Sequence, residues 1–139
     1  MSHSLLIRNA KLNGTLTDAL IVNGIFKTIA PGITCSGGIP TIDARGMVLA
    51  PAFYNGHTHA AMTLLRGYAD DMELFSWLND CIWPAEAKLD PDLVYHGTRL
   101  AIIEMLHTGT VFFNDMYWMA PATVKAANEM GVRAAIGRI

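Results

Sequence analysis

The chain has 139 residues, of which 52% are hydrophobic and 16% are charged, and its formal net charge at pH 7 is -2. This composition is typical of a folded globular segment and excludes a disordered or strongly basic protein, so nucleic acid is not an expected partner. No apolar run approaches the roughly 18 residues of a membrane span, so a membrane is not an expected partner either.

Targeting and redox signals are equally plain. The apolar patch at residues 5–7 is interrupted by Arg8 and is too short for a signal peptide, so we expect a cytoplasmic protein. Cys35 and Cys81 are far apart in the sequence and form no Cys-x-x-Cys pattern. Two such cysteines indicate buried thiols rather than a disulfide framework or a zinc ribbon.

The first 48 residues predict short β-strands. Residues 5–12, 19–22 and 25–29 are rich in strand-forming side chains, and Asn-Gly pairs separate them. Asn-Gly between two such runs is a strong hairpin signal, so these strands are expected to be antiparallel. A Gly-rich connection then leads to one more brief strand at 41–43.

The apolar run at residues 47–53 precedes a pair of histidines, His57 and His59. Such a run is typical of a buried parallel strand. In an extended strand, residues i and i+2 project to the same face, so both imidazoles can point at one metal ion. By spacing alone a His-x-His pair is more often two surface histidines, but a position at the C-terminal end of a parallel strand favours a site. Two imidazoles fill half of a tetrahedral zinc shell, and a catalytic zinc has about three protein ligands.

The long connection after His59 is expected to contain helices of its own. Asp70 to Glu73 has the form of a capping box, and apolar residues recur at helical spacing after it until Pro84 stops the run. Asp90 and Pro91 begin a second helix that ends near Gly109. Its expected apolar face consists of Leu93, Leu100, Ile103 and Leu106.

The remaining residues continue the alternation of strands and helices. Residues 110–116 predict a strand, a helix runs from Pro121 to Gly131, and a third strand begins at Val132. Strand, helix, strand, helix, strand in this order predicts an α/β fold with a parallel sheet and right-handed crossovers.

Several motifs together resemble one known family. They are the stretch from Pro51 to Gly67 with His57-Thr-His59, then Trp77-Leu78, Ile82-Trp-Pro-Ala-Glu86 and Asn114-Asp-Met-Tyr117. They resemble the amidohydrolase superfamily, most closely the methylthioadenosine and S-adenosylhomocysteine deaminases and the related chlorohydrolases. The chain departs from the family pattern at Ala52 and Gly56, which flank the two histidines without replacing them.

The resemblance implies a fold and a division of the chain. Residues 1–48 are expected to form half of a small β-sandwich, and residues 49–139 the first part of a metal-dependent (β/α)8 barrel. Such a barrel takes about 250 residues, so it is incomplete here. The remainder of the barrel, or a self-associated partner, is the expected protein partner.

The resemblance also implies a site. His57 and His59 are the expected metal ligands of one divalent ion, zinc first, although imidazole also suits iron and nickel. The ion would supply hydroxide for hydrolytic deamination of an adenosine derivative. Glu86 matches the glutamate that accepts hydrogen bonds from both ribose hydroxyls, so the expected substrate is a small molecule, a purine nucleoside. The proton-shuttling carboxylate and the other ligands are expected beyond Ile139.

Alternatives to the deaminase remain open at this stage. One keeps the superfamily but changes the reaction to dechlorination or to hydrolysis of another cyclic amidine or amide. The other is a truncated, non-catalytic chain or one piece of a split enzyme. Asp115, at the end of the strand at 110–116, is expected to be structural rather than a ligand. His96 and His107 are expected to be packing or surface residues.

Overall fold

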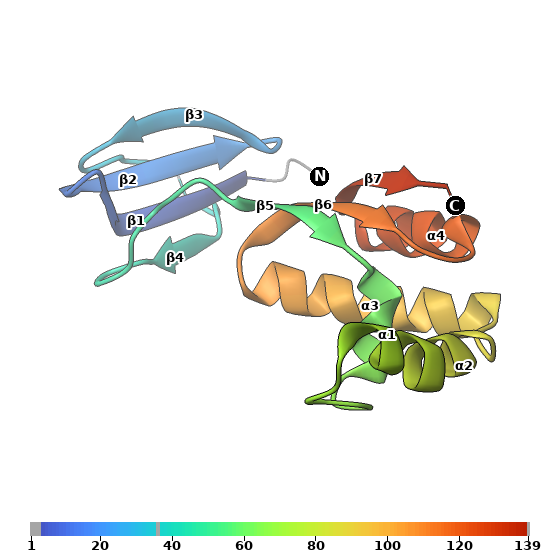
Figure 1. Ribbon diagram of the computed structural model, residues 1–139. Helices are drawn as coiled ribbons and strands as arrows, with labels where there is room; N and C mark the ends of the chain where they lie inside the picture. Colours follow the sequence, from blue (N-terminus) through green and yellow to red (C-terminus); the bar gives the residue numbers. More distant parts are fainter. Residues whose placement is uncertain (1–3, 36, 139) are drawn as a thin grey trace. The chain divides into compact units, whose positions relative to one another are not determined.

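A computed structural model of the chain describes residues 4–35 and 37–138 (Figure 1). The chain divides into two compact units, residues 1–51 and residues 52–139. Among the described residues, no helix is both long enough and apolar enough to cross a lipid bilayer.

The first unit is a four-stranded sheet in the order β3-β2-β1-β4. Strands β1 (Ser4–Leu12), β2 (Thr15–Val22) and β3 (Ile25–Ala30) are antiparallel neighbours, as predicted, and β4 (Thr41–Asp43) pairs with β1 in parallel. The two Asn-Gly pairs form the hairpin turns. Asn13 and Gly14 have φ of 49° and 84°, the left-handed conformation that the tight turn requires and that these two residue types tolerate best.

A buried carboxylate organises the interior of the first unit. Asp18 on β2 is 5% exposed. Its Oδ1 accepts the backbone N–H of Asn9 at 2.9 Å, and its Oδ2 accepts that of Ile33 at 3.0 Å. The Arg8 guanidinium lies 3.5 Å from the same Oδ2. Asp18 therefore satisfies the backbone N–H of Asn9, which the irregular pairing of β1 and β2 leaves outside the sheet ladder, and that of Ile33 in the segment after β3.

The second unit contains a parallel sheet in the order β5-β6-β7. Its strands are β5 (Phe53–Thr58), β6 (Thr110–Met116) and β7 (Arg133–Gly137). Between β5 and β6 lie the 3-10 helix η1 (Ala60–Leu65), a helical run of α1 (Leu74–Ser76), the π-helix η2 (Trp77–Ile82) and α2 (Trp83–Glu86), and then α3 (Pro91–His107). Helix α4 (Ala120–Met130) connects β6 to β7.

Helices α3 and α4 pack against the sheet of the second unit (Figure 1). The core between them contains Ile102 from α3, Phe113 from β6 and Ala126 from α4, each fully buried. The predicted order of strands and helices and the parallel sheet are confirmed. Asp90 caps α3 by accepting the N–H of Leu93 at 2.7 Å, and Gly131 ends α4 with a φ of 69°, both as predicted.

The prediction of a buried strand at residues 47–53 is wrong. Strand β5 begins only at Phe53, and Met47 and Val48 are 60% and 71% exposed. The reason is that residues 47–49 pair with the end of β1 instead. Lys11 donates its backbone N–H to the Met47 carbonyl and accepts that of Leu49, each at 2.9 Å.

Two details of the expected helix around residues 70–84 are also wrong. Glu73 itself is the N-cap, and its Oε2 accepts the N–H groups of Phe75 and Ser76. The helical run does not stop at Pro84 but continues to Glu86. Because η2 ends at Ile82, Pro84 is the second residue of α2 and lies in its first turn, where its missing N–H is not required.

The predicted apolar face of α3 is wrong as well. Leu93, Leu100, Ile103 and Leu106 are all 40–45% exposed. The buried face instead carries Val94, Gly97, Thr98, Ala101 and Ile102. Most of these side chains are small, so η1 can approach the helix closely. A Cβ built on Gly97 would lie only 2.7 Å from the Ala61 carbonyl oxygen.

Candidate functional site

The two predicted metal ligands lie together at the C-terminal end of β5. Their ring centroids are 5.1 Å apart and the ring planes meet at 85°. With zinc–nitrogen distances of about 2.0–2.1 Å in a tetrahedral shell, two imidazoles on one ion have centroids roughly 5 Å apart. His57 is exposed and His59 half-buried. The spacing of the pair therefore fits two ligands of a single divalent ion.

The ring of His59 is oriented by β6. Its Nδ1 lies 2.6 Å from the carbonyl oxygen of Met116. Because a carbonyl oxygen only accepts, Nδ1 must carry the proton, which leaves the Nε2 lone pair free for a metal ion. A metal-binding histidine usually donates its second N–H in this way. Among the described residues, no group of three or more His, Cys, Asp or Glu side chains is arranged to hold a metal ion.

Asp115 anchors the chain next to this pair. It is 1% exposed, and its Oδ1 accepts the backbone N–H of Ala60 at 2.7 Å. Burial raises the pKa of the Asp115 carboxyl, while the hydrogen bond from the Ala60 N–H acts in the opposite direction. No hydrogen-bond donor reaches its Oδ2 from the described residues. The carboxyl thus holds the start of η1 against the end of β6.

Glu86 lies at the end of α2 with both carboxylate oxygens engaged. Oε1 accepts a hydrogen bond from the Tyr117 hydroxyl at 2.8 Å, and Oε2 accepts one from the Trp118 indole N–H at 3.0 Å. A carboxylate has about four acceptor positions, so roughly two remain for other donors. Burial and the neighbouring Glu86 carboxylate raise the pKa of the Tyr117 phenol, which therefore stays protonated and donates.

A cavity of about 240 Å³ lies between His59 and Glu86. His59, Glu86, Tyr117 and Trp118 line it together with apolar side chains from η2. The helix η2 is a π-helix. This form is rare in proteins overall, and where it occurs it is often at a functional site. A mostly apolar pocket with a few convergent polar groups is the usual form of a small-molecule site.

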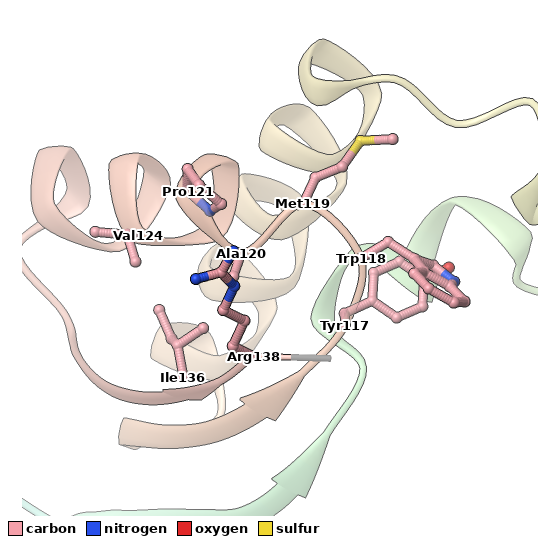
Figure 2. A pocket seen from close by; sticks show the side chains of 8 residues that line it. All are labelled: Tyr117, Trp118, Met119, Ala120, Pro121, Val124, Ile136 and Arg138. Atoms are coloured by element: carbon pink, nitrogen blue, oxygen red, sulfur yellow. The ribbon is translucent and has the colours of Figure 1, made fainter.

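A larger open pocket, about 700 Å³, adjoins the first one because Tyr117 and Trp118 line both. Figure 2 shows its other walls, Pro121 and Val124 of α4 on one side and Ile136 of β7 on the other, with Arg138 beside them. Tyr117 and Trp118 therefore form the boundary between two cavities at the C-terminal ends of β6 and β7.

Sequence reasoning did not identify Tyr117 and Trp118 as functional residues. A usable signal was present, because both residues follow directly after the strand Thr110–Met116. The C-terminal ends of parallel strands share one edge of the sheet, the edge where His57 and His59 were expected.

The model of the amidohydrolase family matches residues 48–139. The chain belongs to the amidohydrolase family. The resemblance inferred from the sequence motifs is thereby confirmed.

Named relatives of this amidohydrolase segment are deaminases. It is 50% identical over 137 residues to 5-methylthioadenosine/S-adenosylhomocysteine deaminase 1 of Archaeoglobus fulgidus, covering 95% of this chain and 32% of that protein. It is 48% identical over 118 residues to the 5'-deoxyadenosine deaminase of Methanosphaera stadtmanae, covering 85% of this chain and 28% of that protein. The chain thus spans about a third of the length of these relatives.

Solved structures show the same fold. The segment superposes on a zinc-bound adenosine deaminase from Xanthomonas campestris with a TM-score of 0.84 and 34% identity, covering 94% of this chain and 32% of that one. It also superposes on an atrazine chlorohydrolase mutant from Arthrobacter aurescens, complexed with zinc and atraton, with a TM-score of 0.81 and 22% identity, covering 96% of this chain and 35% of that one. The second likeness supports the fold alone.

Proposed function

We propose that residues 1–139 are the N-terminal portion of a metal-dependent amidohydrolase that hydrolytically deaminates an adenosine derivative such as methylthioadenosine or S-adenosylhomocysteine. The observation that carries the proposal is the histidine pair, with ring centroids 5.1 Å apart, close to a cavity that His59 and Glu86 both line. The deaminase relatives, at 48–50% identity, support the choice of substrate class.

The proposal includes the domain organisation expected from the sequence. Residues 1–48 would form half of a small β-sandwich and residues 49–139 the first part of a (β/α)8 barrel. Three parallel strands joined in sequence through helices support the barrel, because a right-handed βαβ unit is its repeating element. The remaining strands would come from the rest of the polypeptide or from an associated partner, in a cytoplasmic protein.

His57 and His59 would hold the divalent ion, which we propose to be zinc. When bound, such an ion supplies hydroxide at neutral pH by lowering the pKa of water. The contribution of this chain is to orient the ligands: the Met116 carbonyl fixes the His59 ring so that Nε2 is free. The proton-shuttling carboxylate and further ligands would lie beyond Ile139, so the segment alone is expected to be inactive.

Glu86 would bind the ribose of the substrate. A vicinal diol presents two O–H donors, and a carboxylate offers two oxygens with the matching separation. After the bonds from Tyr117 and Trp118, each Glu86 oxygen retains a further acceptor position. The apolar side chains of η2 that line the same cavity would cover the purine or the sugar.

The test measures release of ammonia from nucleosides and release of chloride from a chlorinated triazine by the purified full-length enzyme. Methylthioadenosine, S-adenosylhomocysteine and 5'-deoxyadenosine are offered beside a chlorinated triazine. We expect the nucleosides to be deaminated. A hydrogen bond to a charged group contributes about 1.5–3 kcal/mol, so Glu86→Gln should raise the nucleoside KM roughly 10- to 100-fold. Glu129→Gln is the matched control, because Glu129 on α4 also accepts a hydrogen bond from a tyrosine, Tyr95. It should leave the KM unchanged. Turnover of the triazine alone would refute the proposal.

A further inference from the structure

The dipeptide Tyr117-Trp118 holds Glu86 from two directions. The tyrosine hydroxyl reaches one carboxylate oxygen at 2.8 Å and the indole N–H reaches the other at 3.0 Å. The donors are 31 and 32 residues from the acceptor in sequence. Two adjacent residues that each take a different oxygen of the same side chain fix both the position and the plane of its carboxylate.

The Tyr117 hydroxyl and the Trp118 indole N–H both remain hydrogen-bond donors over the ordinary pH range. An indole N–H only donates, and the Tyr117 phenol stays protonated because burial and Glu86 raise its pKa. Tyr117 is 4% exposed, so solvent cannot easily replace its bond. Trp118, by contrast, is 45% exposed, so its indole N–H can be removed with little loss of packing.

A fixed carboxylate binds a diol more tightly than a free one. A glutamate side chain loses rotamer freedom when it is immobilised, and this loss of entropy opposes binding. If the protein has already fixed it, ligand binding does not bear that cost, which is the general advantage of preorganisation. The orientation also matters, because two O–H donors on adjacent ribose carbons require the two oxygens in one defined plane.

We infer that Tyr117 and Trp118 are positioning residues that set the preference for ribose over deoxyribose by orienting the Glu86 carboxylate. The inference rests on the proposed function, since it presupposes that Glu86 binds a ribose. It adds that selectivity originates at the end of β6 rather than on α2. A purely structural role, in which the two bonds only tie α2 to β6, makes a different prediction.

The experiment compares adenosine with 2'-deoxyadenosine and 3'-deoxyadenosine as substrates of the full-length enzyme. Tyr117→Phe and Trp118→Phe each remove one donor to Glu86. We expect each variant to raise the adenosine KM about 5- to 20-fold with kcat changed less than about twofold, a smaller effect than that of Glu86→Gln because the carboxylate remains and only its orientation is loosened. The KM for the deoxynucleosides should change much less, so the ribose preference falls by a similar factor.

Tyr95→Phe is the matched control, because the Tyr95 hydroxyl also donates to a carboxylate, that of Glu129, away from the cavity. It should leave the ribose preference unchanged. A lower melting temperature with an unchanged preference in both Tyr117→Phe and Trp118→Phe would overturn the inference and establish the structural role. If Tyr117→Phe does not fold, Trp118→Phe decides alone.

The ribose role of Glu86 and the positioning role of Tyr117 and Trp118 fail separately. If the wild-type enzyme shows no preference for ribose, or Glu86→Gln leaves that preference intact, the ribose role of Glu86 falls and this inference falls with it. If Glu86→Gln abolishes the preference but neither donor variant changes it, the proposed function stands and only the inference is wrong.

Discussion

Replacement of Gly97 by alanine tests how closely α3 packs against η1, the helix that follows His59. Two effects oppose each other. Alanine in a helix interior is favoured over glycine by about 0.8–1.0 kcal/mol. Against this, the new Cβ would lie 2.7 Å from the Ala61 carbonyl oxygen and 3.0 Å from two carbons of Leu64. Overpacking of this kind costs typically about 1–3 kcal/mol.

The geometry indicates that overpacking prevails. The closest atom belongs to the backbone of η1, which cannot rotate away as a side chain can. That backbone is held at Ala60 by Asp115, and Thr63 donates its hydroxyl to the Gly97 carbonyl at 2.9 Å. We therefore expect Gly97→Ala to destabilise the protein by up to about 2 kcal/mol, the difference between the two effects.

Denaturant unfolding of the full-length enzyme measures the change, with bound metal determined in parallel. Gly56→Ala is the matched control, because its Cβ would meet no atom within 4 Å and its φ is not in the left-handed region. Leu64→Ala in the Gly97→Ala background should recover less than half of the loss, since it relieves only the side-chain contact. Stabilisation by Gly97→Ala would show that the helices are not in close contact and would refute the reasoning.

Three further predictions address other parts of the chain. His57→Ala should lose bound metal and ammonia release together, by metal analysis and activity assay, whereas His107→Ala on the exposed surface of α3 should retain both. Asp18→Ala should destabilise the protein in thermal unfolding by about 2 kcal/mol or more, because each donor left without its acceptor costs about 1–3 kcal/mol. The Arg66 guanidinium lowers the pKa of Glu104, so this pair stabilises the fold above the ordinary glutamate pKa and loses its effect as pH falls through the lowered value. A Glu104→Gln variant should therefore differ slightly from wild type at neutral pH and converge with it in acid; a difference that grows in acid would contradict this.

Local chemistry made the first unit predictable. An Asn-Gly pair adopts the left-handed turn almost irrespective of what surrounds it, and both pairs form hairpins in the structure. Helix caps behaved similarly where the donor and acceptor are three residues apart, as at Asp90. The parallel pairing of β4 with β1 was not predictable in the same way, since it joins residues more than thirty positions apart.

The helices were harder because hydrophobicity is an incomplete guide to packing. On α3 the four large apolar residues that the sequence pattern marks are exposed, while Gly97, Thr98 and Ala101 lie on the buried face beside Val94 and Ile102. Because η1 approaches α3 closely, position 97 has no room for a side chain. A hydrophobic pattern does not show this steric requirement. Pro84 is a second example. Proline ends an ordinary α-helix, but here it follows a π-helix and lies in the first turn of the next α-helical segment, where it is tolerated.

The site shows the same division between local and distant determinants. The histidine pair is visible in the sequence because its two members are two residues apart on one strand, and the structure brings their rings together. The contacts of Glu86 with Tyr117 and Trp118 span about thirty residues and depend on where the π-helical run ends. No pattern of spacing within a single element predicts them.

The end of β6 connects every part of the site. Asp115 accepts the N–H of Ala60, and the Met116 carbonyl accepts from the His59 ring. The next two residues, Tyr117 and Trp118, donate to the carboxylate at the end of α2. Four consecutive residues thus fix the end of β5, the start of η1 and the end of α2. The proposed metal ligand His59 and the proposed substrate residue Glu86 can therefore lie on separate elements and still keep a defined geometry, because one strand end positions both.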